Sequence, residues 1–290
     1  MLTLTFLGTG SAFAKRNFNS NALVEAWRDG PDRQSAPDAT LLIDFGVTGP
    51  LALHALMGVA GFEYLRCGAS ADYRRIERVF VTHTHFDHVG GLEELAFCNL
   101  HVQRDDGGEP RRPMLLSGAP VIERLWEQSL RGGLGVLHGR AACLEDYFEA
   151  AAIDVGDGRG FRLLDRYRLD LFATDHIRLA EPYDWPSYGL CVRDESSGRS
   201  SFYSGDTRHD PAAFGPMLAA ADVSFHEVQL GDEEDPVHAR LDQLRLWPPE
   251  VRRRIWLYHY SDDWDAPRFA SVAGEFAGFA RPGRRYVLFD

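Results

Sequence analysis

Short apolar segments rich in β-branched and aromatic residues recur along the whole chain. Glycine, proline and other turn-forming residues bound these segments, which is typical of short β-strands. The segments that predict strands are residues 2–7, 21–25, 40–44, 78–82, 114–117, 167–174, 188–193, 200–204, 222–226 and 255–258. Two of them, 188–193 and 200–204, flank the turn-forming stretch 195–198 and therefore predict a hairpin.

Amphipathic stretches with helical spacing of apolar positions lie between those strands. They predict helices at residues 50–59, 89–98, 120–130, 211–220, 239–246 and 267–279. Polar stretches rich in glycine or charge predict loops at 28–39, 104–112 and 156–160. Because no stretch reads as a linker, we expect one α/β domain over residues 1–290, with sheets packed inside helices.

Three histidines and one aspartate occur within six positions, directly after the strand predicted at 78–82. Alternate residues of an extended segment point the same way, so His83 and His85 can bind one ion together. Asp87 and His88 follow where the chain turns into a helix, and there they can face a second ion. Imidazole and carboxylate ligands favour zinc, with manganese and iron as alternatives.

The run of residues 82–91, THTHFDHVGG, resembles the signature of the metallo-β-lactamase-fold superfamily. Residues 6–11, FLGTGS, are similar to the opening strand and turn of the ribonuclease Z-like branch. Residues 42–46, LIDFG, resemble the early strand and aspartate of the superfamily. The fold that this resemblance implies is a four-layer αββα sandwich with the metal ions at one edge of the sheets.

The resemblance also implies the partners of the histidine run. His176 precedes the PSYGL segment at 186–190, as does the third histidine of the first ion; His101 and His138 are rivals by position but precede no such strand. SGDT at 204–207 matches the segment with the bridging aspartate, and LYHYS at 257–261 matches the last histidine motif. The implied ligands are His83, His85 and His176 for one ion, Asp87, His88 and His259 for the other, and Asp206 as the bridge.

In such a site the metal ions lower the pKa of a shared water toward ~7 and so provide a hydroxide nucleophile at neutral pH. Asp87 is expected to orient this water or to take its proton. The segment VHARL at 237–241 follows FHE at 225–227, and this pairing resembles the ribonuclease Z and cyclic-phosphodiesterase branch. There the histidine matched by His238 donates a proton to the leaving oxygen, and Glu227 can orient it.

A general acid is useful because an alkoxide is a poor leaving group. The alternative for His238 is a surface residue at the start of a helix. His226 is expected either to act directly at the site or to be a buried residue at the end of a strand. His54, His101, His138 and His209 are expected to be structural or exposed.

The net charge of the chain and the spacing of two predicted ligands narrow the class of substrate. The formal net charge of −12 argues against a broad electrostatic grip on nucleic acid. His176 and Asp206 are only 206 − 176 = 30 positions apart, which leaves no room for the long basic arm with which ribonuclease Z enzymes clamp tRNA. We therefore expect a small phosphodiester, such as a cyclic nucleotide or cyclic phosphate, rather than RNA. Tyr183 and Trp185 are expected either to stack on a base or to pack on the surface.

The sequence thus predicts a dinuclear metal-dependent phosphodiesterase. Three alternatives stay open: a ribonuclease Z-type tRNA 3′-processing endonuclease, a lactone or carboxylic-ester hydrolase, and a metal-bound sensor without activity.

No stretch approaches the ~18 apolar residues that span a membrane, and the N-terminus alternates like a strand rather than a signal peptide. Four scattered cysteines without a CxxC pair favour free thiols and a cytoplasmic protein. The resemblance further implies a homodimer.

Overall fold

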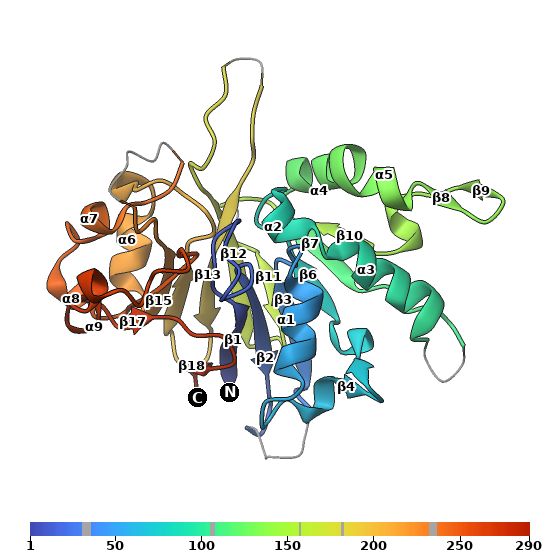
Figure 1. Cartoon of the computed structure of the whole chain (residues 1–290), viewed down its shortest axis with the longest axis horizontal. Coiled ribbons are helices and arrows are strands. Elements are labelled where there is room, and N and C mark those ends of the chain that lie inside the picture. The colour runs from blue at the N-terminus through green and yellow to red at the C-terminus, as the bar shows by residue number, and fades with distance from the viewer. Residues whose placement is uncertain (31–35, 105–107, 157, 181–182, 232–236) are drawn as a thin grey trace.

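The computed structural model describes the chain except for residues 31–35, 105–107, 157, 181–182 and 232–236. Among the described residues, two seven-stranded sheets lie face to face (Figure 1). The first sheet has the strand order β10-β7-β6-β3-β2-β1-β18. Its strands are β1 (Leu2–Gly8), β2 (Asn21–Ala26), β3 (Ala39–Ile43), β6 (Arg78–Phe80), β7 (Met114–Ser117), β10 (Glu149–Ala152) and β18 (Arg285–Phe289).

The second sheet has the order β11-β12-β13-β14-β15-β16-β17. Its strands are β11 (Phe161–Leu163), β12 (Tyr167–Ala173), β13 (Tyr188–Asp194), β14 (Ser200–Tyr203), β15 (Val223–Glu227), β16 (Ile255–Tyr258) and β17 (Gly278–Phe279). The predicted hairpin is confirmed, because β13 and β14 pair antiparallel.

Helices cover the outer face of each sheet (Figure 1). Those beside the first sheet are α1 (Gly49–Leu56), α2 (Phe86–Val89), α3 (Leu92–Phe97), α4 (Ala119–Leu125) and α5 (Arg131–Leu134). Those beside the second sheet are α6 (Pro211–Ala220), α7 (Leu241–Leu244), α8 (Pro249–Arg252) and α9 (Val272–Glu275). The described chain also contains two small hairpins, β4 (Arg66–Cys67) with β5 (Ser70–Ala71) and β8 (Val136–Leu137) with β9 (Arg140–Ala141), and short 3-10 or π-helical segments such as Trp126–Leu130 directly after α4. The layers form the predicted αββα sandwich. In the described part of the chain, no helix combines the length and apolar character that crossing a membrane requires.

Aromatic rings fill the space between the two sheets. Phe6 of β1 is fully buried, and its ring centroid lies 6.4, 5.5 and 5.3 Å from those of Tyr203, Phe225 and Tyr258 in the second sheet. Buried aromatic pairs of this kind stabilise a core by apolar area and by ring geometry. The sheets are therefore held together just below the strand ends that carry the predicted ligands.

The strand ends that carry those residues share one edge. β14, β15 and β16 are mutually parallel, and β12 runs the same way because β12 and β14 are both antiparallel to β13. The loops that leave these carboxyl ends therefore emerge together, next to the loop after β6 of the first sheet (Figure 1). Loops held by rigid strands are the usual place of a functional site.

Two predicted helices differ from the structure for identifiable reasons. The prediction of one helix at 267–279 is wrong: the segment holds a turn at Pro267–Phe269, then α9, then the strand β17, which pairs with β16. Gly278 at φ 128° turns the chain into that strand. The helix predicted at 239–246 shrinks to α7, because Arg240 is extended and pairs with Gln229: the Gln229 amide donates to the Ala239 carbonyl oxygen, and the Leu241 amide donates to the Gln229 carbonyl oxygen.

Other boundaries also moved. The helix predicted at 89–98 is shorter in the structure: Val89 ends α2, Gly90 and Gly91 separate the two helices, and α3 covers Leu92–Phe97. A side chain at Gly91 would meet the Gly46 carbonyl oxygen at 2.7 Å, so the chain approaches its neighbour too closely for any other residue. The strands β10, β11 and β18 were not delimited from the sequence. Parts of the loops predicted at 28–39, 104–112 and 156–160 fall outside the described residues.

Candidate metal centre

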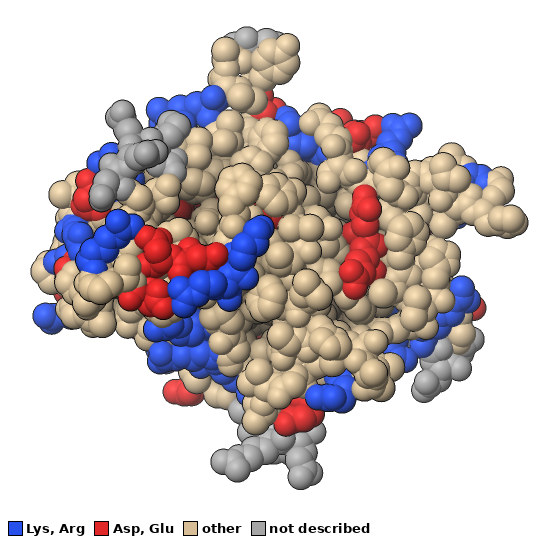
Figure 2. All heavy atoms as spheres, viewed as in Figure 1, with Lys and Arg blue, Asp and Glu red and all other residues tan. Residues whose placement is uncertain are grey.

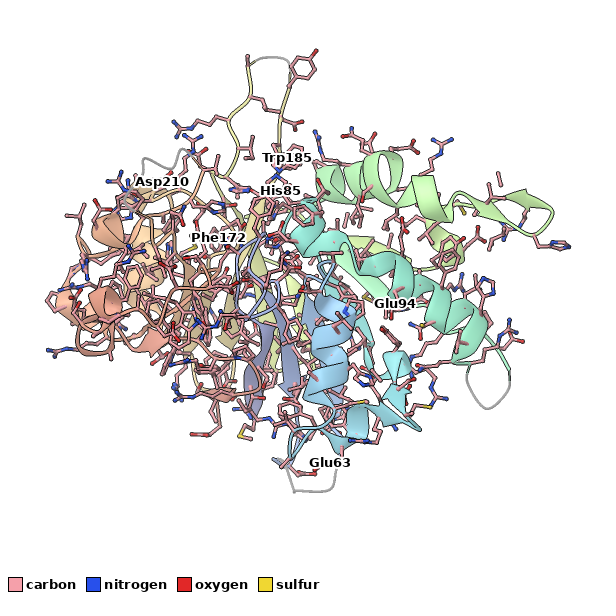
Figure 3. The ribbon with its side chains drawn as sticks, in the orientation of Figure 1. Glu63, His85, Glu94, Phe172, Trp185 and Asp210 are labelled. Atoms are coloured by element: carbon pink, nitrogen blue, oxygen red, sulfur yellow. The ribbon has the colours of Figure 1, made fainter. Side chains whose placement is uncertain are left out.

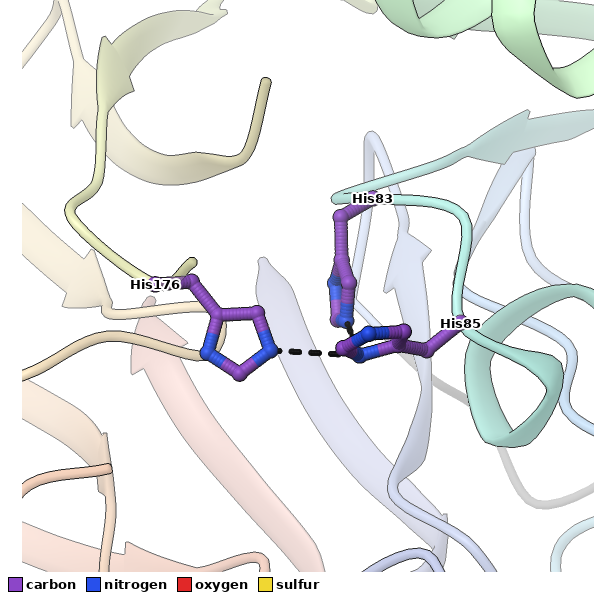
Figure 4. A group of neighbouring side chains, drawn as sticks. All are labelled: His83, His85 and His176. Atoms are coloured by element: carbon purple, nitrogen blue, oxygen red, sulfur yellow. Dashed lines mark hydrogen bonds between the residues drawn. The ribbon is translucent and has the colours of Figure 1, made fainter. Parts of the chain in front are cut away.

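Three histidines from both sheets converge on one point (Figure 4). His83 follows β6, His85 precedes α2, and His176 follows β12. His85 Nδ1 lies 2.9 Å from His83 Nε2 and 3.2 Å from His176 Nε2. Zn–N bonds of ~2.1 Å in a tetrahedral site place ligand atoms about 3.4 Å apart. The three ring nitrogens are therefore spaced as the ligands of a single ion would be.

A second group contains the other ligands of the histidine run. His88 Nε2 lies 3.3 Å from Asp87 Oδ2, and His259 Nε2 lies 3.4 Å from the same oxygen. All three side chains are buried. His259 adopts φ 58° directly after β16, in the left-handed region that non-glycine residues rarely occupy. This turn in the backbone accompanies the approach of its ring to the loop after β6, and such strain is characteristic of functional sites.

Asp206 lies between the two groups. Its Oδ2 is 3.2 Å from His88 Nε2, 3.3 Å from His259 Nε2 and 3.9 Å from His83 Nε2. The carboxylate thus borders both groups, as expected of a bridging ligand. The structure brings all seven predicted ligand residues into one cluster: His83, His85, Asp87, His88, His176, Asp206 and His259.

The donor set of this cluster fits divalent cations. Asp206 Oδ1 is buried without a hydrogen-bond partner among the described residues, and the buried His88 Nε2 faces the Asp87 and Asp206 carboxylates without a well-formed hydrogen bond to either. Within the same part of the chain, the ion-pair partners of Asp87 and Asp206 are histidines, with no arginine or lysine among them. Buried carboxylates are costly without a compensating positive charge. Metal ions would supply that charge at the orphaned atoms.

Burial sets the protonation of the first group. It lowers the pKa of the His83 imidazole well below its usual value, and it lowers the pKa of His176 to about 4. Both rings are therefore neutral at pH 7, the form that binds metal. Burial by itself raises the pKa of Asp206, but the neighbouring His259 and His88 hold this pKa well below the usual value, so the carboxylate is charged.

Asp44, directly after β3, contacts residues of the loop that carries the histidine run. Its Oδ2 accepts hydrogen bonds from His88 Nδ1 and from Thr82 Oγ1, each at 2.7 Å. The Thr82 hydroxyl lies 3.0 Å from His83 Nδ1 and can accept its proton in a hydrogen bond. One carboxylate thus fixes the ring of His88 directly and that of His83 through Thr82, which leaves their Nε2 atoms facing the cluster. The sequence motif had placed Asp44 in an early strand without this role.

Replacing Asp44 with asparagine should weaken metal binding about 10- to 100-fold, the usual effect of losing such a supporting carboxylate. The amide retains the shape but loses the charge that holds the His88 and Thr82 donors. Affinity is measured by competition between the metal-free protein and a chelator. Asp38→Asn, just before the other end of β3, is the matched control. Equal affinities of Asp44→Asn and wild type would contradict the assigned support.

His238 and Glu227 lie together beside the cluster. Glu227 ends β15, is fully buried, and accepts the Ala239 amide proton at 2.9 Å. His238 Nδ1 lies 3.4 Å from Glu227 Oε1, and the His238 ring centroid is 5.0 Å from that of His176 and 4.9 Å from that of His259. The side chain of His238 is 20% exposed. It therefore borders both ligand groups while it stays open to solvent.

The remaining histidines that were considered lie elsewhere. His226 is buried, with its Nδ1 2.7 Å from the Glu227 carbonyl oxygen and its ring against Phe202 and Phe214, so it is a core residue. In the described chain the candidate ligand groups include none of these five: His54, His101, His138, His209 and His226.

The two aromatic residues that follow His176 have different environments. Trp185 packs on His85 with ring centroids 4.9 Å apart, and Figure 3 shows the two side chains adjacent at the top of the sheets. Tyr183 is 73% exposed. Trp185 therefore lies against the cluster. The sequence offered no signal for this contact beyond the position of Trp185 after His176.

Comparison with known proteins identifies close relatives. The family described as "Anti-Pycsar protein Apyc1" matches residues 2–286. A relative of that name from Paenibacillus sp. (strain J14) is 38% identical over 95% of this chain and 96% of its own length. Another, from Bacillus phage vB_BsuM-Goe3, is 34% identical over 98% of both chains.

Solved structures of more distant proteins share the fold. Unliganded yeast PDE1 superposes with a TM-score of 0.70 at 11% identity over 98% of both chains. Zn²⁺-bound PqqB from Methylobacterium extorquens gives 0.66 at 13% identity over 99% of this chain and 100% of its own. The metallo-β-lactamase fold protein YhfI from Bacillus subtilis gives 0.63 at 16% identity over 98% of both chains. The predicted superfamily fold is thereby confirmed.

Proposed function

The chain belongs to the anti-Pycsar protein Apyc1 family, and we propose that it is a dinuclear metal phosphodiesterase that hydrolyses a small cyclic phosphodiester of the cyclic-nucleotide class. The family and the cluster of candidate metal ligands support the coarser statement, a metal-dependent hydrolase of phosphodiesterase type. One observation supports the more specific proposal, a dinuclear phosphodiesterase. Two ligand groups meet at Asp206, and His238 borders both of them on an accessible side.

The ligand groups would hold two divalent ions, for which we propose zinc, with manganese and iron as alternatives. Nitrogen-rich groups with carboxylates suit these metals better than magnesium or calcium. When bound, such ions lower the pKa of a shared water toward ~7 and offset phosphate charge. Asp87 and Asp206 lie beside both His88 and His259, so their carboxylates can orient that water.

His238 would act as the general acid. With Nδ1 directed at the Glu227 carboxylate, its Nε2 is the nitrogen that can donate a proton to the departing ribose oxygen. Glu227 holds the orientation of the ring, since it is itself fixed by the amides of Ala239 and Thr207 at 2.9 and 3.3 Å. Partial exposure lets His238 recover its proton from solvent after each turnover.

A small substrate fits the surroundings better than tRNA does. Between β12 and β14 the described chain contains the strand β13 and the loop after His176, which projects from the body of the molecule in Figure 1 but contains no helix or strand among its described residues. Arginines on the face in Figure 2 are interspersed with acidic residues rather than gathered into one basic surface. The net charge of −12 also argues against a broad electrostatic grip on tRNA.

The direct test is a substrate panel with metal-loaded protein. It contains 3′,5′- and 2′,3′-cyclic nucleotides, bis-p-nitrophenyl phosphate, precursor tRNA and a lactone. We expect turnover of cyclic nucleotides and of bis-p-nitrophenyl phosphate. Cleavage of precursor tRNA alone would favour the ribonuclease Z alternative, and turnover of the lactone alone would refute the phosphodiesterase.

We also propose a cytoplasmic homodimer. All four cysteines are free thiols, in keeping with that compartment. The exposed apolar side chains Phe13, Val47, Leu51 and Phe86 lie on α1, α2 and neighbouring loops, over which the surface in Figure 2 carries few charges. Light scattering should give the mass of two chains, and Leu51→Asp should shift it toward one. A wild-type monomer at micromolar concentration would contradict the dimer.

A further inference from the structure

Trp185 lies against a candidate ligand, although the proposed chemistry does not use it. Its ring centroid is 4.9 Å from that of His85, with 37° between the planes (Figure 3). The indole Nε1 is buried and has no hydrogen-bond partner among the described residues. The residue therefore meets the cluster through the face and edge of its ring rather than through a polar bond.

His85 differs from three other ligand candidates in what holds its ring. The second ring nitrogens of His83, His88 and His176 contact Thr82 Oγ1, Asp44 Oδ2 and the Val237 carbonyl oxygen, at 3.0, 2.7 and 2.9 Å. In the described part of the chain, His85 Nε2 has no such hydrogen bond. His85 is also less buried than those three rings. Its orientation must therefore come from packing, and Trp185 supplies that packing.

Trp185 is itself held from α4. The Arg124 guanidinium carbon lies 4.9 Å from the Trp185 ring centroid, within cation–π range. Arg124 Nη2 donates to the Asp184 carbonyl oxygen at 2.8 Å, and Nη1 donates to Gln128 Oε1 at 3.0 Å. The Arg124 side chain is only 19% exposed. Arg124, Trp185 and His85 thus form a continuous stack from a helix of the outer layer to the cluster.

We propose that Trp185 is a positioning residue: it fixes the ring of His85 and thereby sets the affinity of the first ligand group for its ion. This inference rests on the proposed metal centre. It makes a distinct prediction, because loss of Trp185 should affect one ion and spare the group formed by Asp87, His88 and His259. Trp185 acts through His85 rather than on the substrate.

The test measures zinc binding by metal-free protein, in competition with a chelator and without substrate. Trp185→Ala should weaken one of the two binding steps about 10- to 100-fold, the range seen when residues that orient a ligand are removed. Trp185→Phe keeps an aromatic face and should recover most of that loss, whereas Trp185→Leu, of comparable apolar character, should not. Arg124→Met should produce a smaller loss of the same step.

Tyr183→Ala is the matched control, since it removes an exposed aromatic side chain from the same segment. It should bind both ions as wild type does. Thermal unfolding of the metal-free variants separates positioning from folding: the Trp185→Phe and Trp185→Leu proteins should melt alike and yet differ in one zinc affinity.

Equal zinc affinities of Trp185→Ala and wild type would overturn this inference and leave the proposed function standing. Equal losses in Trp185→Phe and Trp185→Leu would also overturn it, because an aromatic face would then be irrelevant. Wild-type protein that binds no zinc would contradict the proposed metal centre and this inference together. Failure of the substrate panel with normal zinc binding would contradict the proposed function alone.

Discussion

Asp206→Asn should lose at least one bound ion per chain and lower turnover of a cyclic nucleotide by about 10³-fold or more. Two correctly placed metal ions stabilise the charge of the transition state by several kcal/mol, and a loss of that size slows the reaction by about 10³-fold. Asp206 Oδ2 lies 3.2–3.9 Å from ring nitrogens of both ligand groups. An amide of the same shape supplies no charge there, and its NH₂ group would face a cation.

Metal analysis of purified protein, combined with turnover at saturating substrate, checks this prediction. Asp222→Asn is the control, because its carboxylate lies near the surface before the opposite end of β15 and bonds the Ser200 amide. It should keep two ions and normal turnover. Two retained ions in Asp206→Asn with wild-type turnover would refute the bridge.

His238→Ala should reduce turnover of cyclic nucleotides by about 10²- to 10⁴-fold, the usual contribution of a general acid. The effect should be much smaller on bis-p-nitrophenyl phosphate, because p-nitrophenolate leaves without protonation. The ring lies about 5 Å from those of His176 and His259 and holds its orientation through Glu227. Leaving-group dependence therefore distinguishes proton donation from metal binding, which would affect both substrates alike.

Glu227→Gln should also lower turnover of cyclic nucleotides more than turnover of bis-p-nitrophenyl phosphate. The loss should be smaller than in His238→Ala, since the amide keeps a contact with His238 but not the charge. His138→Ala is the control for removal of a histidine, because His138 is exposed and remote from the ligand groups. Equal loss on both substrates in His238→Ala would exclude the general-acid role and indicate a ligand role instead.

The ligands that could be predicted follow recognisable local patterns. His83, His85, Asp87 and His88 lie in one short run after a strand, so their spacing alone indicates metal binding. His176, Asp206 and His259 are distant in sequence and were found only through motifs that resemble a superfamily. The structure brings them together because the strands before them are parallel and end at one edge.

The supporting contacts could not be predicted, because they depend on tertiary packing. Asp44 reaches His88 across 44 positions, and Trp185 reaches His85 across 100. The motif at 42–46 singled out Asp44 but not its partner, and Trp185 was noted only for its position after His176. The wrong helix at 267–279 has a similar cause: a spacing that suits a helix gave way to pairing of β17 with β16.

The most direct test of the central claim is a metal titration of metal-free protein while hydrolysis of a 3′,5′-cyclic nucleotide is followed. Turnover should be absent without metal, rise with added zinc, and reach its plateau at two equivalents per chain. Full turnover without metal, a plateau at one equivalent, or a fully loaded protein that leaves every phosphodiester intact would contradict a dinuclear metal phosphodiesterase.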